Sequence, residues 1–175
     1  MFKIYECLTK FSTLYKINQI NRFSTEYHLH EESVSSHSYY VSLFIYYLHN
    51  FYNFDLLKSL KMSLIHDLPE NYIGDFPYHI KSENFKLFEI FDDLDKKYIN
   101  NCSEIFNEIN ELCDEFNNHK SVESIICNFA DKLSSALFCY TEVNLGNNLF
   151  KNKLESKLEI CKTYLILLKN YIKEV

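Results

Sequence analysis

The spacing of apolar residues along the chain predicts helices along most of its length. Apolar side chains recur every three to four residues, which is the period of a helix with one buried face. The stretches with this period cover residues 5–15, 36–51, 56–66, 82–99, 103–116, 121–144 and 149–172. We therefore expect one all-α domain over residues 1–175, a bundle of about seven helices.

Capping residues stand at several of the expected helix ends. Asp55 and Ser82 occupy N-cap positions before the third and fourth helices, and Ser33 and Ser36 precede or open the second. Gly146 follows the sixth helix, where a glycine commonly ends a helix. The polar stretch 21–36 has no helical period, so we expect a loop there.

Apolar stripes define the faces of these helices. Those of the first and third helices consist of Tyr5, Leu8, Phe11 and Tyr15, and of Leu57, Leu60 and Leu64. We expect the third helix to be buried.

Composition supports an all-helical protein and does not favour a polyanionic partner. Hydrophobic residues make up 47% of the chain, and there are only two glycines and two prolines, whereas turn-rich β folds need more of both. The net charge of −6 does not favour a nucleic acid polymer as partner. The longest nearly apolar run, residues 39–48, is too short to span a bilayer, and no signal peptide pattern opens the chain. Six cysteines without a C-x-x-C pair indicate reduced thiols, so we expect a cytoplasmic protein.

The segment SLIHDLPENYIGDF, residues 63–76, places ionisable groups at the end of an apolar helix. His66 and Asp67 are adjacent, and Glu70 and Asp75 follow. Burying such groups without partners is costly, so something must compensate them. Adjacent residues on a helix diverge by about 100°, so His66 and Asp67 share a metal only if it lies between their two directions.

Two further residues are candidates to complete a metal site. His37 points inward if Tyr40, Val41 and Phe44 do, and Asp131 lies beside an apolar stripe. That stripe comprises Ile126, Ala130, Leu133 and Leu137, and Asp131 shares the adjoining one with Cys127 and Ser134. Two imidazoles and two carboxylates suit a divalent transition metal, Co, Mn, Fe or Zn, better than Mg. The alternative is that a buried histidine here is a hydrogen-bonded core residue and not a ligand.

Several short motifs in this order resemble a known family. The order H…HD…D resembles the HD-domain metal-dependent phosphohydrolases, which implies that the expected single-domain bundle is of the HD type. The segments INRF, ESVSSHS, HDLPENYIGDFP, ADKL and GNN, between residues 20 and 148, are similar to stretches of the bacterial HD-domain 5′-deoxynucleotidases. Phe23 stands where that family has tryptophan, Ser36 where it has an acidic residue, and His28 and His30 where it has basic ones.

The resemblance implies a set of roles. The metal ligands would be His37, His66, Asp67 and Asp131. Glu70 matches the family's catalytic glutamate, and Asp75 an aspartate near the sugar or the water network. Arg22, Phe23 and Lys81 match residues of the substrate pocket.

Each assignment has a plainer alternative. Glu70 would be a surface residue, Asp75 a solvated turn residue, Arg22 a loop arginine paired with Glu26, and Lys81 a solvated lysine. The remaining histidines are expected at the surface or in packing: His28, His30, His49, His79 and His119.

The resemblance implies hydrolysis of deoxyribonucleoside 5′-monophosphates to nucleoside and phosphate, with a small-molecule nucleotide as partner and a homodimer as assembly. Two alternatives stay open. One is an HD hydrolase of another nucleotide, such as a triphosphate, or of another small phosphoester, and the other is a non-catalytic nucleotide-binding module. Only Arg22 and Lys81 are candidates to bind phosphate, which favours a monophosphate.

Overall fold

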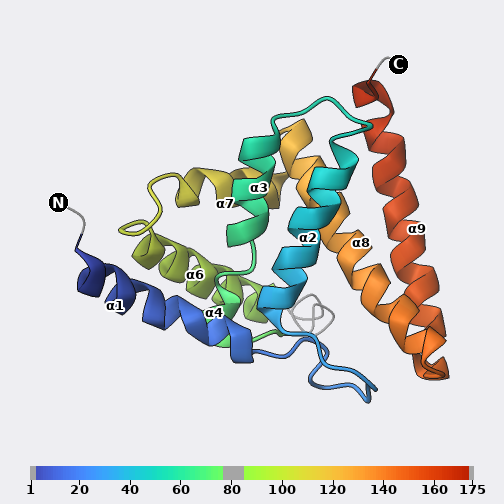
Figure 1. Ribbon diagram of the computed structural model, residues 1–175, viewed down its shortest axis with the longest axis horizontal. Helices are drawn as coiled ribbons and strands as arrows, with labels where there is room; N and C mark the ends of the chain where they lie inside the picture. The colour runs from blue at the N-terminus through green and yellow to red at the C-terminus, as the bar shows by residue number, and fades with distance from the viewer. Residues whose placement is uncertain (1–2, 77–84, 174–175) are drawn as a thin grey trace.

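The computed structural model describes residues 3–76 and 85–173, and this part of the chain is helical (Figure 1). Its seven helices of ten residues or more are α1 Ile4–Leu14, α2 Val34–Leu48, α3 Leu56–Ile65, α6 Phe85–Cys102, α7 Ile109–Asn118, α8 Val122–Asn144 and α9 Lys151–Leu167. A single-turn helix α4, Glu70–Ile73, and three 3₁₀ turns, η1 Tyr15–Gln19, η2 Asn148–Phe150 and η3 Leu168–Tyr171, join them. Within the described ranges the only β pairing is two isolated bridges, and the all-α prediction is confirmed.

The longest helix, α8, forms the centre of the fold. It packs against α9 on one side and against α2 and α3 on the other, while α7 contacts α3, α6 and α8 (Figure 1). Helix α1 lies at the edge of the molecule and approaches the rest through its C-terminal end. The residues predicted to bind metal come from α2, α8 and the chain that follows α3. Because α2 and α3 both pack against α8, these three segments lie close together.

Helix α2 turns one continuous buried face toward α8. That face consists of Val34, His37, Val41, Ile45 and Leu48. The inward orientation of His37 is therefore confirmed. The supporting expectation for Tyr40 was wrong, because its side chain is 42% exposed, whereas Val41 is fully buried.

The predicted stripe of α3 is rotated in the structure. Leu57 and Leu64 are exposed, whereas Leu60 is partly buried against the core. The fully buried residues of this helix are Ser59, Met62, Ser63 and Ile65. Small serines permit close approach of α3 to α2, and the hydroxyls of Ser63 and Ser42 lie 2.9 Å apart. Periodicity favours leucine as the inward residue, but the position that faces α2 is occupied by Ser63, whose hydroxyl contacts Ser42.

The stripe of α1 is also exposed at Tyr5, Leu8, Phe11 and Tyr15, although the ring of Phe11 contacts that of Phe106. Leu14 is the buried residue of this helix. The helix itself is confirmed, although Tyr15 belongs to η1. The side-chain amide of Asn71 donates to the carbonyl of Thr13, 2.9 Å away, which fastens the C-terminal end of α1.

Most of the predicted caps are confirmed. Ser33 and Asp55 accept hydrogen bonds from backbone N–H groups at the starts of α2 and α3, and Gly146 has φ +99° just after α8. Ser82 lies outside the described residues. The start predicted at residue 103 was wrong, because turns separate Cys102 from α7.

All six cysteines are free thiols, as expected, and five of them are buried. Among the helices that the structure describes, none combines the length and apolar character needed to cross a membrane.

Candidate metal centre

Three ligand atoms converge where α2 meets the chain that follows α3. Oδ2 of Asp67 lies 3.2 Å from Nε2 of His66 and 3.6 Å from Nε2 of His37. These three residues can each offer an atom within 4.8 Å of the other two. The adjacent pair does converge, because His66 is the C-cap of α3 and a turn follows it.

The hydrogen bonding of His66 prepares one nitrogen for a metal. Its Nδ1 lies 2.9 Å from the carbonyl oxygen of Ser63, so Nδ1 carries the proton and donates it. Nε2 is buried and makes no hydrogen bond of acceptable geometry among the described residues. Burial alone would lower the pKa of His66, but the adjacent Asp67 outweighs it and raises that pKa, so Nε2 binds a proton readily. A divalent metal ion would replace that proton, next to a carboxylate and a second imidazole.

Charge also suits a cation here. Burial, followed by the nearby Arg22 charge, lowers the pKa of His37 to about 4, so this ring is neutral at neutral pH. Burial alone would raise the pKa of Asp67, but the neighbouring His66 outweighs it and holds that pKa below its usual value. A neutral imidazole and an ionised carboxylate are the forms that bind metal.

Asp131 lies at the edge of this cluster. Its Oδ1 is 3.1 Å from Nε2 of His37, and its Oδ2 accepts a hydrogen bond from Lys132 at 2.7 Å. It is not one of the three residues that meet within 4.8 Å. Cys127 and Ser134, which share its predicted stripe, are buried. Asp131 therefore contacts one histidine of the cluster but stands outside the tight group.

Arg22 adds a cation on the other side of His37. Its Nη1 lies 2.7 Å from Glu32 and 2.6 Å from Nδ1 of His37, and its Nη2 donates to Ser135 at 3.0 Å. The alternative pairing with Glu26 was wrong, because Glu26 pairs with Lys153. Burial lowers the pKa of Arg22, but Glu32, Asp67 and Asp131 outweigh it and raise that pKa.

The other predicted residues surround the cluster. Asp75 accepts a hydrogen bond from the backbone N–H of Phe23 at 3.1 Å, so it is not merely a solvated turn residue. Glu70 is the first residue of α4, is partly buried, and lies close enough to Arg22 to raise its pKa. Lys81 lies outside the described residues.

The sequence reasoning missed several residues near the site. Lys132 pairs with Asp131, and the partly buried Lys157 on α9 lies within electrostatic range of Asp131 and Arg22. Glu142 is fully buried and binds His30, which was expected only at the surface or in packing. One face of α8 carries positions 131, 135, 138 and 142 at helical spacing. Tracing this face from Asp131 along the sequence would have identified Ser135 and Glu142 as further candidates near the site.

A helical bundle with a histidine–aspartate cluster is the arrangement of the HD-domain phosphohydrolases, and this chain has both features. A family model described as 5′-deoxynucleotidase YfbR-like matches residues 9–173. The chain therefore belongs to the YfbR-like 5′-deoxynucleotidase family. It is 28% identical over 162 residues to a 5′-deoxynucleotidase of Erwinia tasmaniensis, covering 85% of this chain and 81% of that protein.

Solved structures share the fold. A protein from Pyrococcus horikoshii OT3 superposes with TM-score 0.75 at 24% identity, covering 93% of this chain and 96% of that one. An HD-domain phosphohydrolase from Listeria innocua superposes with TM-score 0.70 at 20% identity, covering 90% of this chain and 81% of that one. The cyanophage S-2L HD phosphohydrolase DatZ, bound to dA and one catalytic Zn²⁺ ion, gives TM-score 0.58 at 14% identity, covering 97% and 96%.

Proposed function

We propose that this protein hydrolyses deoxyribonucleoside 5′-monophosphates to nucleoside and inorganic phosphate with a divalent metal. The observation that carries the proposal is the convergence of His37, His66 and Asp67 beside Arg22, in a chain that the 5′-deoxynucleotidase family model matches over residues 9–173. The curated relative from Erwinia tasmaniensis has the same named activity.

Four residues would hold the metal: His37, His66, Asp67 and, at the edge, Asp131. When bound, a divalent ion supplies Lewis-acid stabilisation of phosphoryl oxygens and an acidified water. The mixed nitrogen and oxygen donors favour Co, Mn, Fe or Zn over Mg. The Zn²⁺ ion in DatZ is consistent with this choice.

The protein's own groups would carry out the remaining steps. Arg22, whose guanidinium is fixed by Glu32 and Ser135, would bind a phosphate oxygen. Glu70 would deliver a proton to the 5′-oxygen as the bond to phosphorus breaks, because an alkoxide is a poor leaving group. Phe23 would lie against the sugar or base. Asp75 would act through its hydrogen bond to the backbone of Phe23.

A triphosphate hydrolase is the second candidate. Among the described residues, Lys132 and Lys157 bring more positive charge near the cluster than Arg22 alone. Much of that charge is already offset, because Lys132 pairs with Asp131 and Arg22 pairs with Glu32. A monophosphate therefore remains the better match.

One experiment tests the proposal directly. Metal is removed with a chelator, and phosphate release is measured from deoxy- and ribonucleoside mono- and triphosphates after adding back Co²⁺, Mn²⁺, Zn²⁺ or Mg²⁺. We expect release from deoxymonophosphates with a transition metal. Release from triphosphates alone would favour the second candidate, and nucleotide binding without release would favour a non-catalytic module.

The assembly remains a prediction. Exposed aromatic residues on α2, Tyr39, Tyr40, Tyr46 and Tyr47, offer a surface for the homodimer that the family resemblance implies. Sedimentation velocity of the purified protein measures this directly.

A further inference from the structure

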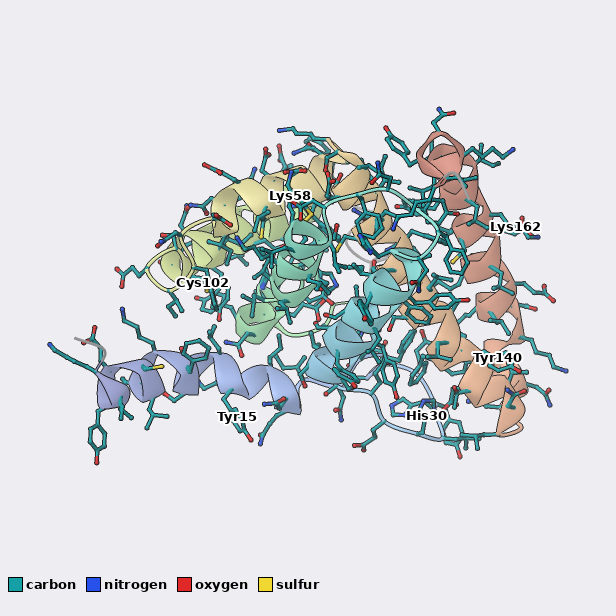
Figure 2. All side chains as sticks on the ribbon, turned by 45° about the horizontal axis from the view of Figure 1, so that its top comes forward. Tyr15, His30, Lys58, Cys102, Tyr140 and Lys162 are labelled. Carbon is teal, nitrogen blue, oxygen red and sulfur yellow. The ribbon has the colours of Figure 1, made fainter. Side chains whose placement is uncertain are left out.

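The loop between η1 and α2 is fastened to the C-terminal end of α8 by one buried carboxylate. Glu142 is fully buried, and its oxygens accept hydrogen bonds from the backbone N–H groups of Leu29, at 2.9 Å, and His30, at 3.0 Å. Nδ1 of His30 lies 2.5 Å from the same carboxylate. In Figure 2, His30 lies in this loop beside the end of α8 that carries Tyr140.

Asn147 completes the anchor. Its side-chain amide donates to Glu142 at 2.6 Å and to the backbone carbonyl of Tyr27 at 3.0 Å. Burial raises the pKa of Glu142, but hydrogen bonds from Asn147, Leu29 and His30 outweigh it and lower that pKa. A buried charge is costly unless it is fully hydrogen-bonded. Moving the loop away would remove the donors of Leu29 and His30 from the buried carboxylate, so the structure favours the loop in this position.

The anchor reaches the predicted substrate pocket through stacked rings. His30 stacks on Phe138 of α8 with ring centroids 4.4 Å apart. Phe138 in turn stacks on Phe23 at 4.4 Å, with an angle of 7° between the ring planes. The edge of Phe150 packs against both phenylalanine rings. A continuous set of contacts therefore connects Glu142 to Phe23.

Phe23 needs such support because its backbone has φ +57°, a conformation that bulky residues rarely adopt. Surrounding contacts must maintain it, and those contacts are the Phe138 stack and the hydrogen bond to Asp75. Arg22 directly precedes Phe23, so the direction of its guanidinium toward His37 depends on the same backbone.

We propose that Glu142 and His30 are positioning residues, which hold Phe23 and Arg22 in the orientation that receives the nucleotide. This inference rests on the proposed function, because the nucleotide is the ligand that the two residues would orient. Neither residue touches the reacting atoms. Releasing the anchor should displace Phe23 and Arg22. It should leave the proposed metal ligands in place.

The test compares Glu142→Gln with Glu159→Gln, a matched control on the exposed face of α9. In Glu142→Gln we expect faster amide hydrogen exchange at Leu29 and His30, unchanged metal stoichiometry, and a KM for deoxynucleoside monophosphate raised about tenfold with a smaller change in kcat. The control should match the wild type. Unchanged exchange, or faster exchange with unchanged KM, would overturn the positioning role.

Two variants of His30 keep the inference testable if Glu142→Gln does not fold. His30→Phe preserves the stack on Phe138 and removes the bond to Glu142, whereas His30→Asn preserves a hydrogen-bond donor and removes the stack. A raised KM at full metal loading in either variant supports the inference, and an unchanged KM in both contradicts it. Wild-type protein that releases no phosphate from any nucleotide would instead defeat the proposed function.

Discussion

Nη1 of Arg22 lies 2.6 Å from Nδ1 of His37, on the opposite edge of the ring from Nε2, which faces Asp67 at 3.6 Å. Arg22 is the single arginine of the chain. One imidazole therefore separates a guanidinium suited to phosphate from a carboxylate suited to metal. A phosphate that reached both groups would lie across the edge of His37, next to the start of α2.

Replacing Arg22 by lysine should weaken substrate binding. Lysine cannot reproduce the planar fork that contacts Glu32, His37 and Ser135 together. We expect kcat/KM for deoxymonophosphates to fall about tenfold to a hundredfold, mainly through KM, while metal content stays constant. Lys162→Arg, at an exposed position of α9 paired with Glu159, is a control that introduces the reverse exchange and should retain the wild-type kcat/KM. An unaltered kcat/KM in Arg22→Lys would remove this residue from the phosphate site.

Asp131→Asn tests the ligand that stands outside the tight cluster. The substitution retains the size of the side chain and removes its charge. We expect affinity for Co²⁺ or Mn²⁺ to fall about a hundredfold, measured by titration and by elemental analysis after dialysis. The exposed Asp114, paired with Lys120, provides the matched control as Asp114→Asn. Stoichiometric metal retained in Asp131→Asn at wild-type affinity would restrict the site to His37, His66 and Asp67.

Glu70→Gln separates proton transfer from binding. The amide keeps the shape of the side chain but cannot deliver a proton to the leaving 5′-oxygen. We expect kcat to fall about 10²- to 10⁴-fold, with metal content and nucleotide affinity close to those of the wild type. Glu108→Gln, an exposed residue paired with Lys61, should be fully active. If Glu70→Gln turns over at the normal rate, another group supplies the proton.

Sequence patterns predicted the helices, and the predicted ligands His37, His66 and Asp67 lie together in the structure, but other predictions from periodicity fail at particular residues. His37 could be placed inward because it shares a stripe with Val41, which is fully buried. The buried faces of α1 and α3 could not be predicted in this way, because burial depends on which helix packs against each face. Leu64 is exposed and Ser63 buried since α3 approaches α2 through serine hydroxyls.

Contacts distant in sequence explain the rest. The pairing of Arg22 with Glu32 instead of Glu26 follows from the path of the loop, which no local pattern encodes. Glu142 and His30 meet across 112 residues. Motif spacing identifies ligands that a family shares, but it carries no information about a carboxylate that orders a loop.

Acidification should reveal the contribution of Glu142 to stability. Its pKa lies below the ordinary value of 4.5, so the folded state binds this proton less readily than the unfolded chain does. The stabilisation is complete above about pH 4.5 and is lost as pH falls through the folded pKa. We expect Glu142→Gln to lose about 1–3 kcal/mol of unfolding free energy at pH 7 and to converge on the wild type at low pH. Urea titrations of metal-free protein measure this, and a constant difference across the pH range would refute it.

Metal binding should stabilise the fold, because the cluster joins α2 to the segment after α3. Saturation at a hundred times the dissociation constant contributes about 2.7 kcal/mol, or roughly 5–10 °C in Tm for a chain of this size. We expect Co²⁺ or Mn²⁺ to raise Tm in differential scanning calorimetry and a chelator to reverse the rise. His66→Ala should abolish the shift, since the available Nε2 is lost, whereas His49→Ala at the end of α2 should retain it. An equal shift in both variants would mean that the metal binds elsewhere.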